Sequence, residues 1–109
     1  GRVVVRAKLP AALGTWPAIW TLGQNVNEQG AYWQTQGYGQ VSWPFCGEID
    51  IMEQDANKNL TSGAFHFPGA NGNHTYTYDN TPVANSATMW HDYAMEWTED
   101  SIILPFGYN

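Results

Sequence analysis

Short runs of alternating apolar and polar residues constrain the fold of this chain more than any other feature. In the first run, Val3 and Val5 share one parity, whereas Arg6 and Lys8 share the other. Residues of one parity lie on one face of a β-strand, so this run predicts a half-buried strand that ends at Pro10. Similar runs predict further strands within residues 14–23, 43–55, 60–69, 73–80 and 89–104.

No segment combines a helix cap with apolar residues at a period of 3.6. The predicted fold class is therefore all-β, an antiparallel β-sandwich. Residues 24–42 are rich in Gly, Gln and Asn and are expected to form a long loop. In the last run, Tyr93, Met95 and Trp97 share one face and are predicted to lie in the core. A full sandwich often has roughly 200–250 residues, so 109 residues are expected to form an incomplete portion of one domain.

The composition argues against several classes of function. The chain has a net charge of −6 and only four Lys and Arg residues, so no nucleic-acid partner is expected. It has no run of 18 apolar residues, so no membrane-spanning helix is expected. Its single cysteine, Cys46, leaves no partner for an internal disulfide. Aromatic residues make up 15% of the chain and include six Trp, which is more than a core of this size needs.

One predicted strand carries several carboxylates, in the stretch WPFCGEIDIMEQD of residues 43–55. Because burying an unpaired carboxylate is costly, this strand is expected to present one face to solvent or to a ligand. Glu48 and Asp50 share one parity, and Glu53 has the other. A β-bulge inserts one extra residue and reverses the facing of the residues beyond it. A bulge near Ile51 and Met52 would therefore place all three carboxyls on one face.

Carboxyls grouped in this way suit the hydrolysis of a glycosidic bond. One carboxyl protonates the leaving oxygen, and the other acts as a nucleophile or activates a water molecule. A carboxyl between them, such as Asp50, can share a proton with a neighbour, and crowding of like charges should raise at least one pKa. The spacing leaves open which glutamate is the acid. It also leaves open a solvated acidic strand or a calcium site, although calcium usually binds loops with Gly and Asn spacers.

In its motifs the sequence closely resembles glycoside hydrolase family 16, specifically the bacterial laminarinases, which are endo-β-1,3-glucanases. The resemblance rests on GTWPAIWTLG followed by WPFCGEIDIMEQ, with support from GRVVVRAKLP and HDYAMEWTEDSII. It implies a concanavalin A-like jelly roll whose substrate cleft lies on a concave sheet. It also implies that residues 1–109 are the central part of a single catalytic domain, truncated at both ends.

The resemblance implies roles for the three carboxyls in a retaining mechanism that passes through a covalent glycosyl-enzyme. Glu48 matches the nucleophile, Glu53 the acid/base and Asp50 the assisting carboxylate. The implied function is an endo-glycosidase that hydrolyses β-1,3-glucan of the laminarin type or mixed-linkage β-glucan. Two alternatives remain open: a non-catalytic, lectin-like carbohydrate-binding fragment on the same scaffold, and a family member acting on another polysaccharide such as agarose or carrageenan.

Four further residues are candidates for substrate binding. Trp43 matches a tryptophan that stacks on a sugar near the cleavage point, and Trp20 and Trp16 match tryptophans of the cleft. Such stacking is physically reasonable because aromatic planes suit the apolar faces of sugar rings. His66 has the opposite parity to its phenylalanine neighbours, and it matches a histidine on the neighbouring strand that faces the site.

The remaining expectations concern partners and location. The resemblance implies a β-glucan polysaccharide or oligosaccharide as the partner, and a monomeric protein. Because the implied substrate is polymeric, an extracellular or periplasmic location is expected. No cofactor and no catalytic metal are expected, and a structural calcium ion in the full domain remains open.

Overall fold

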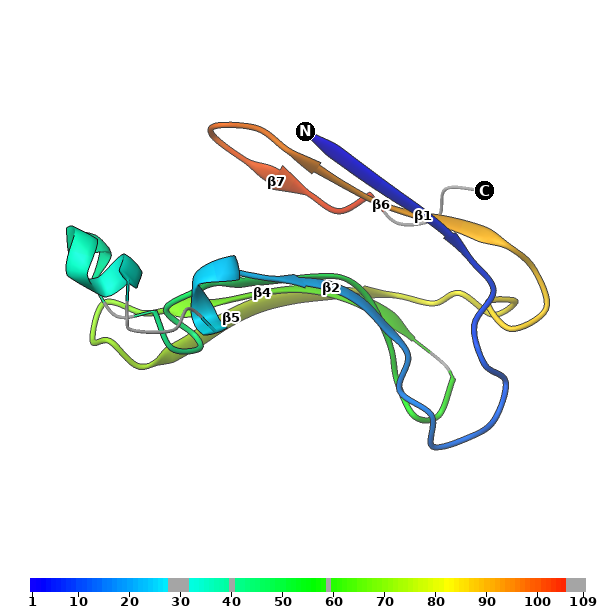
Figure 1. Ribbon diagram of the computed structural model, residues 1–109. Coiled ribbons are helices and arrows are strands. Elements are labelled where there is room, and N and C mark those ends of the chain that lie inside the picture. Colours follow the sequence, from blue (N-terminus) through cyan, green and yellow to red (C-terminus); the bar gives the residue numbers. More distant parts are fainter. Residues whose placement is uncertain (28–31, 40, 59, 106–109) are drawn as a thin grey trace.

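The computed structural model describes residues 1–27, 32–39, 41–58 and 60–105, which form two antiparallel β-sheets (Figure 1). The smaller sheet has the strand order β1-β6-β7, with β1 (Arg2–Ala7), β6 (His91–Trp97) and β7 (Ile102–Ile103). The larger sheet has the strand order β2-β3-β4-β5, with β2 (Ala18–Leu22), β3 (Glu48–Gln54), β4 (Thr61–Pro68) and β5 (His74–Thr81). The predicted all-β, antiparallel fold is confirmed.

The two sheets lie face to face, with an apolar core between them (Figure 1). On β1, Val5 and Ala7 are half-buried and Arg6 is exposed, as alternation predicts, whereas Val3 is 40% exposed. The buried core side chains come from β3, from β6 and from the segment after β1. They are Leu9, Ile49, Ile51, Met52, Tyr93 and Met95.

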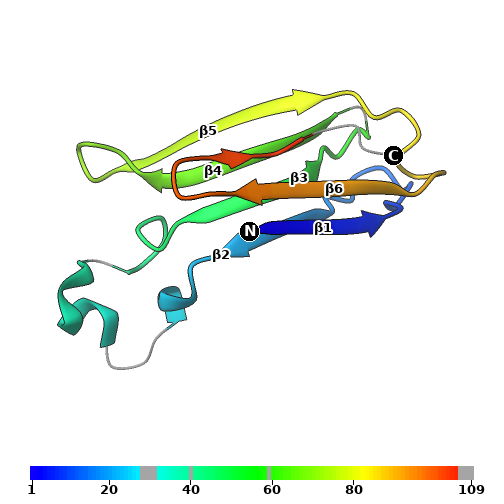
Figure 2. The same ribbon diagram turned by 90° about the horizontal axis from the view of Figure 1, so that it is seen from above.

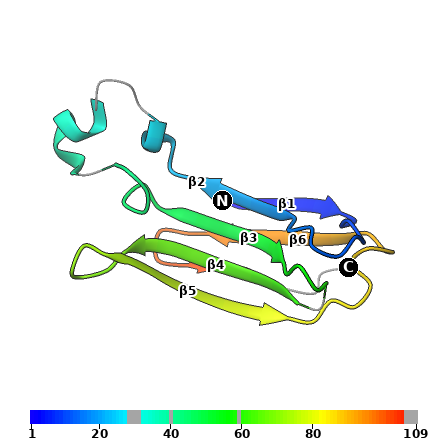
Figure 3. The same cartoon turned by 90° about the horizontal axis from the view of Figure 1, so that it is seen from below.

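The larger sheet bends away from the smaller one, so its free face is concave (Figure 1). Its four strands follow one another across this face (Figure 3). The pairing register aligns residues of all four strands in rows across the sheet. The two central rows are Trp20, Asp50, Ala64, Tyr78 and Leu22, Glu48, His66, Tyr76.

The segment expected to be a long loop, residues 24–42, contains helical turns that the sequence did not predict. A 3₁₀ turn spans Gln24–Asn27 (η1) and a π-helical turn spans Gln34–Tyr38 (η3), and both lie beyond the end of β2 (Figure 2). Such short turns lack the repeating apolar face by which helices are recognised in a sequence. Residues 28–31 and 40 of the expected loop lie outside the described residues. Within the described part of the chain, no helix has the length and apolar character needed to cross a membrane.

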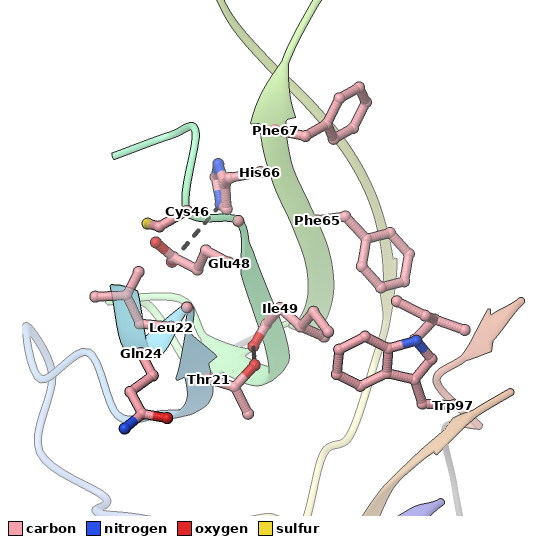
Figure 4. A pocket seen from close by; sticks show the side chains of 13 residues that line it. Thr21, Leu22, Gln24, Cys46, Glu48, Ile49, Phe65, His66, Phe67 and Trp97 are labelled. Carbon is pink, nitrogen blue, oxygen red and sulfur yellow. Dashed lines mark hydrogen bonds and ion pairs between the residues drawn. The ribbon is translucent and has the colours of Figure 1, made fainter. Parts of the chain in front are cut away.

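Trp97 does not occupy the core position predicted for it. Tyr93 and Met95, which share its parity on β6, are 5% and 4% exposed, whereas Trp97 is 52% exposed. It lies at the end of β6 and faces Phe65 across the space between the sheets (Figure 4). Alternation along β6 identified the face on which Trp97 lies. Burial also requires side chains from another element to cover that position, and alternation does not show whether they are present.

Candidate active site

The three carboxyls of β3 lie on the concave face because this strand contains a β-bulge. In the pairing of β3 with β4, Asp50 faces Ala64 and Glu53 faces Ser62. Between Asp50 and Glu53, β3 therefore carries one more residue than β4 carries between Ala64 and Ser62. The pairing of β3 with β2 shifts register at the same place.

The bulge turns two successive side chains toward the core. Ile51 is 3% exposed and Met52 is 1% exposed, and both belong to the core cluster. A regular strand would instead place residues 49, 51 and 53 on the core face. Because Met52 takes the third core position, Glu53 returns to the face of Glu48. The bulge expected near these two core residues is confirmed.

Asp50 is the buried member of the three carboxyls. It is 2% exposed and interacts with Glu48 and with Glu53. Burial, hydrogen bonding with Glu48, and the charges of Glu53 and Glu48 raise the pKa of Asp50 to about 8. Since a carboxyl with this pKa keeps its proton at neutral pH, Asp50 can donate its O–H to a glutamate. The neutral carboxyl also prevents three adjacent negative charges on one strand.

Two histidines extend the cluster toward β5. His66 is the cross-strand partner of Glu48, and its Nε2 lies 2.9 Å from Oδ2 of Asp50 and 4.0 Å from Oε1 of Glu48. The Nδ1 atom of His66 lies 2.9 Å from Nε2 of His74. His66 therefore lies beside the carboxyls, on the face that its parity predicted.

Each carboxyl of β3 has a tryptophan near it. The indole N–H of Trp43 donates a 2.7 Å hydrogen bond to Oε2 of Glu48. Trp20 is the partner of the central carboxyl on β2, and Trp16, just before β2, lines a hollow together with Glu53. The exposed fractions of Trp43, Trp20 and Trp16 are 43%, 53% and 71%. Indoles that remain this exposed beside a polar site are available for stacking on a ligand.

Comparison with known proteins assigns this arrangement to a family. Residues 1–105 match the sequence profile of Glycosyl hydrolases family 16. The chain belongs to glycosyl hydrolase family 16. This membership confirms the resemblance seen in the motifs, and it places the chain in a family of enzymes that hydrolyse glycosidic bonds.

Related proteins in family 16 differ in substrate. The beta-glucanase of Rhodothermus marinus is 39% identical to this chain, over 94% of the chain and 33% of that protein. The keratan-sulfate endo-1,4-beta-galactosidase of Sphingobacterium multivorum is 32% identical, over 94% of the chain and 22% of that protein. LamA of Zobellia galactanivorans, solved with laminaritriose and laminaritetraose, has a TM-score of 0.80 and 44% identity over 95% of this chain and 42% of that one. The chain thus spans at most about a third of the length of these two curated relatives.

Sequence analysis missed three side chains at this family 16 site, all on β5. The rings of His74, Tyr76 and Tyr78 lie in series on the concave side, with centroids 5.6 Å and then 5.9 Å apart. Trp43 continues the series, since its ring centroid lies 4.5 Å from that of His74. The alternation in NHTYTYDN could have indicated their shared face. Only the pairing of β4 with β5 brings that face next to the carboxyls.

A pocket opens at the end of the sheet where β3 begins (Figure 4). Glu48 and His66 point to one side of the larger sheet there, whereas Phe65 and Phe67 point to the other side, where Trp97 of the smaller sheet lies. The pocket therefore joins a polar edge to an apolar space between the sheets, and neither of the other two carboxyls lines it. The open concave face of this family 16 chain, rather than the pocket, presents the three carboxyls together.

The residues Glu48, Asp50 and His66 have ligand atoms within 4.8 Å of one another, a spacing that a metal ion could bridge. The chemistry of these donors does not favour a cation. Asp50 is neutral near pH 7 because its pKa is about 8, and both ring nitrogens of His66 already have partners. Hydrogen bonding within the group accounts for the cluster.

Replacing Asp50 with asparagine is expected to change how the stability of the full-length protein depends on pH. The ordinary pKa of 3.8 is raised to about 8 in the folded state, so between these values the unfolded chain releases a proton that the folded chain keeps. The free energy of unfolding of the wild type should therefore fall as pH rises across this window. Between pH 5 and 8 the wild type should lose up to about 4 kcal/mol relative to Asp50→Asn, at about 1.4 kcal/mol per pH unit.

Urea unfolding of both proteins at pH 5 and at pH 8 measures this difference. The comparison between the two proteins cancels the titration of other groups that the substitution leaves unchanged. Parallel pH profiles for the wild type and Asp50→Asn would contradict a protonated carboxyl at position 50.

Proposed function

We propose that residues 1–109 supply the catalytic centre of a retaining endo-glycosidase that acts on β-1,3-glucan of the laminarin type or on mixed-linkage β-glucan. The observation that carries the proposal is the bulged strand β3, which holds Glu48 and Glu53 on one concave face with a protonated Asp50 between them. Two carboxyls on one face are the minimum that glycoside hydrolysis requires, and in retaining enzymes they lie close together, about 5–5.5 Å apart.

The proposed reaction has two steps. In the first, Glu48 attacks the anomeric carbon while Glu53 gives its proton to the leaving glycosidic oxygen. In the second, Glu53 takes a proton from a water molecule, and this water attacks the same carbon and releases Glu48. The Trp43 indole donates to Oε2 of Glu48, so the attack on the anomeric carbon is assigned to Oε1. When the second step releases Glu48 from the sugar as a carboxylate, the O–H of Asp50 can donate a hydrogen bond to it.

The charge distribution supports a neutral glucan as the substrate. Three of the four basic residues lie between Arg2 and Lys8, on β1 or just after it, and so belong to the smaller sheet. A sulfated galactan such as carrageenan or keratan sulfate would favour positive charge in the cleft. The exposed Trp43, Trp20 and Trp16, which lie beside the carboxyls of β3, instead suit the apolar faces of glucose rings. The laminari-oligosaccharides bound in the LamA structure agree with this choice.

We also propose that residues 1–109 form part of a single family 16 catalytic domain, since the chain spans at most about a third of its curated relatives. The tests of activity below therefore use the full-length protein that carries this chain. An extracellular or periplasmic location and a monomeric state complete the proposal, because a polymeric substrate does not enter cells intact.

A panel of polysaccharides tests the substrate and the reaction together. The full-length protein is expected to release reducing ends from laminarin or lichenan, and far fewer from agarose, carrageenan or keratan sulfate. Proton NMR at early times is expected to show the β-anomer of the product, because two displacements at one carbon retain configuration. An α-anomer as the first product would contradict the retaining mechanism. Binding of laminarin without release of reducing ends would favour the lectin-like alternative.

A further inference from the structure

We propose that His74 is a positioning residue, which holds His66 in the tautomer and orientation that let its Nε2–H donate to Asp50. The inference rests on the proposed function, because it concerns the carboxyl that lies between the two catalytic glutamates. His74 is not part of the motif that joins Asp50 to Glu48 and Glu53, and it touches none of these carboxyls in the contacts described above.

The geometry is a continuous chain of contacts across three strands. His74 on β5 places its Nε2 2.9 Å from Nδ1 of His66 on β4. The other ring nitrogen of His66, Nε2, lies 2.9 Å from Oδ2 of Asp50 on β3. His66 is only 20% exposed in its side chain, so both ring nitrogens are directed at protein partners rather than at solvent.

The position of the Asp50 proton decides which atom donates in each contact between Asp50, His66 and His74. Asp50 makes hydrogen bonds with Glu48 and with Glu53, and two carboxyl groups can share a hydrogen bond only if one of them supplies a proton. If Asp50 supplies it, the O–H of Asp50 points to a glutamate and its Oδ2 acts as an acceptor. Oδ2 must then receive the Nε2–H of His66, so Nδ1 of His66 carries a lone pair.

That lone pair needs a donor, and His74 is the group in place to provide it. A neutral His74 with its proton on Nε2 donates to Nδ1 of His66 and excludes the other tautomer of His66. The ring of His74 is itself held by aromatic contacts, with centroid distances of 4.5 Å to Trp43 and 5.6 Å to Tyr76. By holding His66 in this tautomer, a neutral His74 keeps the Nε2–H of His66 directed at Asp50 throughout the reaction.

The groups that face the contacts between His74, His66 and Asp50 come from several elements. Glu48, Asp50 and Glu53 face them from β3, Tyr76 lies beside them on β5, and the indole of Trp43 covers them from the segment before β3. A second proton on His66 would occupy Nδ1 and remove the acceptor of this contact, whereas a second proton on His74 would leave its Nε2–H in place as a donor. The acidic limb of the kcat profile should therefore depend on residue 74.

Two substitutions in the full-length protein separate hydrogen bonding from packing. His74→Phe keeps an aromatic ring against Trp43 and Tyr76 but cannot donate, and His74→Gln retains an N–H near the position of the imidazole Nε2. In His74→Phe, kcat for laminarin is expected to fall about tenfold with KM changed less than about twofold, because one hydrogen bond that positions His66 beside Asp50 is lost. His74→Gln is expected to recover most of kcat, and the acidic limb should move only in the phenylalanine variant.

The tautomer of His66 provides a readout that does not depend on activity. Nitrogen-15 NMR of the imidazoles is expected to show His66 protonated at Nε2 in the wild type and in His74→Gln, and a mixture of tautomers in His74→Phe. A wild-type His66 protonated at Nδ1, or the same kcat and pH profile in both variants, would overturn the proposal. If the wild type does not hydrolyse laminarin, the proposed function fails, and the NMR result alone then decides the role of His74.

Discussion

Replacing Glu48 with glutamine is expected to lower kcat for laminarin by about 10⁴-fold or more in the full-length protein, while oligosaccharide binding remains measurable. Glutamine keeps the length of the side chain and an oxygen that can accept the hydrogen bond of the Trp43 indole. Its amide cannot form the covalent bond to the anomeric carbon, so the reaction path itself is lost. Reducing-end assays and calorimetric titration with laminari-oligosaccharides measure catalysis and binding separately.

The matched control for this variant is Glu96→Gln. Glu96 lies on β6 in the smaller sheet, where it pairs with Arg2 at 3.4 Å, and its loss should leave activity unchanged. Azide added to Glu48→Ala with an activated aryl β-glucoside then identifies the role. Azide in the place of the nucleophile gives an α-glycosyl azide, whereas rescue of an acid/base variant gives the β-product. Undiminished hydrolysis by Glu48→Gln would contradict the assignment.

Replacing Glu53 with glutamine is expected to lower activity on laminarin by about 10²–10⁴-fold, because the amide cannot give a proton to the leaving glycosidic oxygen. The bulge exists because β3 has one more residue than β4 between Asp50 and Glu53. This extra residue keeps Glu53 on the face of Glu48, and a glutamine at position 53 stays on that face. The substitution therefore removes the proposed acid/base without moving its side chain to the core.

Two further variants separate this effect from a loss of stability. Met52→Ala keeps the bulge and should cost about 2–5 kcal/mol of stability, as truncation of a buried Met usually does, because Met52 is 1% exposed. It should remain active below its unfolding temperature. Deleting Met52 removes the extra residue of β3 and leaves Glu53 two residues after Asp50, so regular alternation keeps it on the face of Glu48. The deletion is therefore expected to retain activity in reducing-end assays at temperatures where the protein stays folded. A deletion variant as inactive as Glu53→Gln under those conditions would contradict the placement of Glu53.

The bulge itself could be predicted from the sequence, and the reason is specific. Glu48 and Asp50 share a parity that Glu53 lacks, so three carboxyls with one purpose require one extra residue. Their crowding also predicted a raised pKa, but not which group would have it. Asp50 has it because its side chain is 2% exposed, whereas Glu48 and Glu53 are only partly buried. Burial of this kind depends on the neighbouring strands β2 and β4.

The errors and omissions have a common cause. Trp97 has the parity of two core residues and is nevertheless half-exposed, because no described element covers the end of β6. Alternation could place His74 on a face of its strand but not beside His66, since that 2.9 Å contact joins two different strands. The helical turns within residues 24–42 are too short to show a helical period.

By itself the sequence determined the positions of the strands, the face of each strand on which the carboxyls, tryptophans and His66 lie, and the family 16 motifs. These are properties of one strand at a time, because alternation follows from the geometry of an extended backbone. Only the tertiary structure decided that β5 places His74 beside His66, that Asp50 is the buried carboxyl, and that Trp97 remains exposed. Those outcomes depend on register and packing between strands, and the residues involved come from parts of the chain that no local pattern connects.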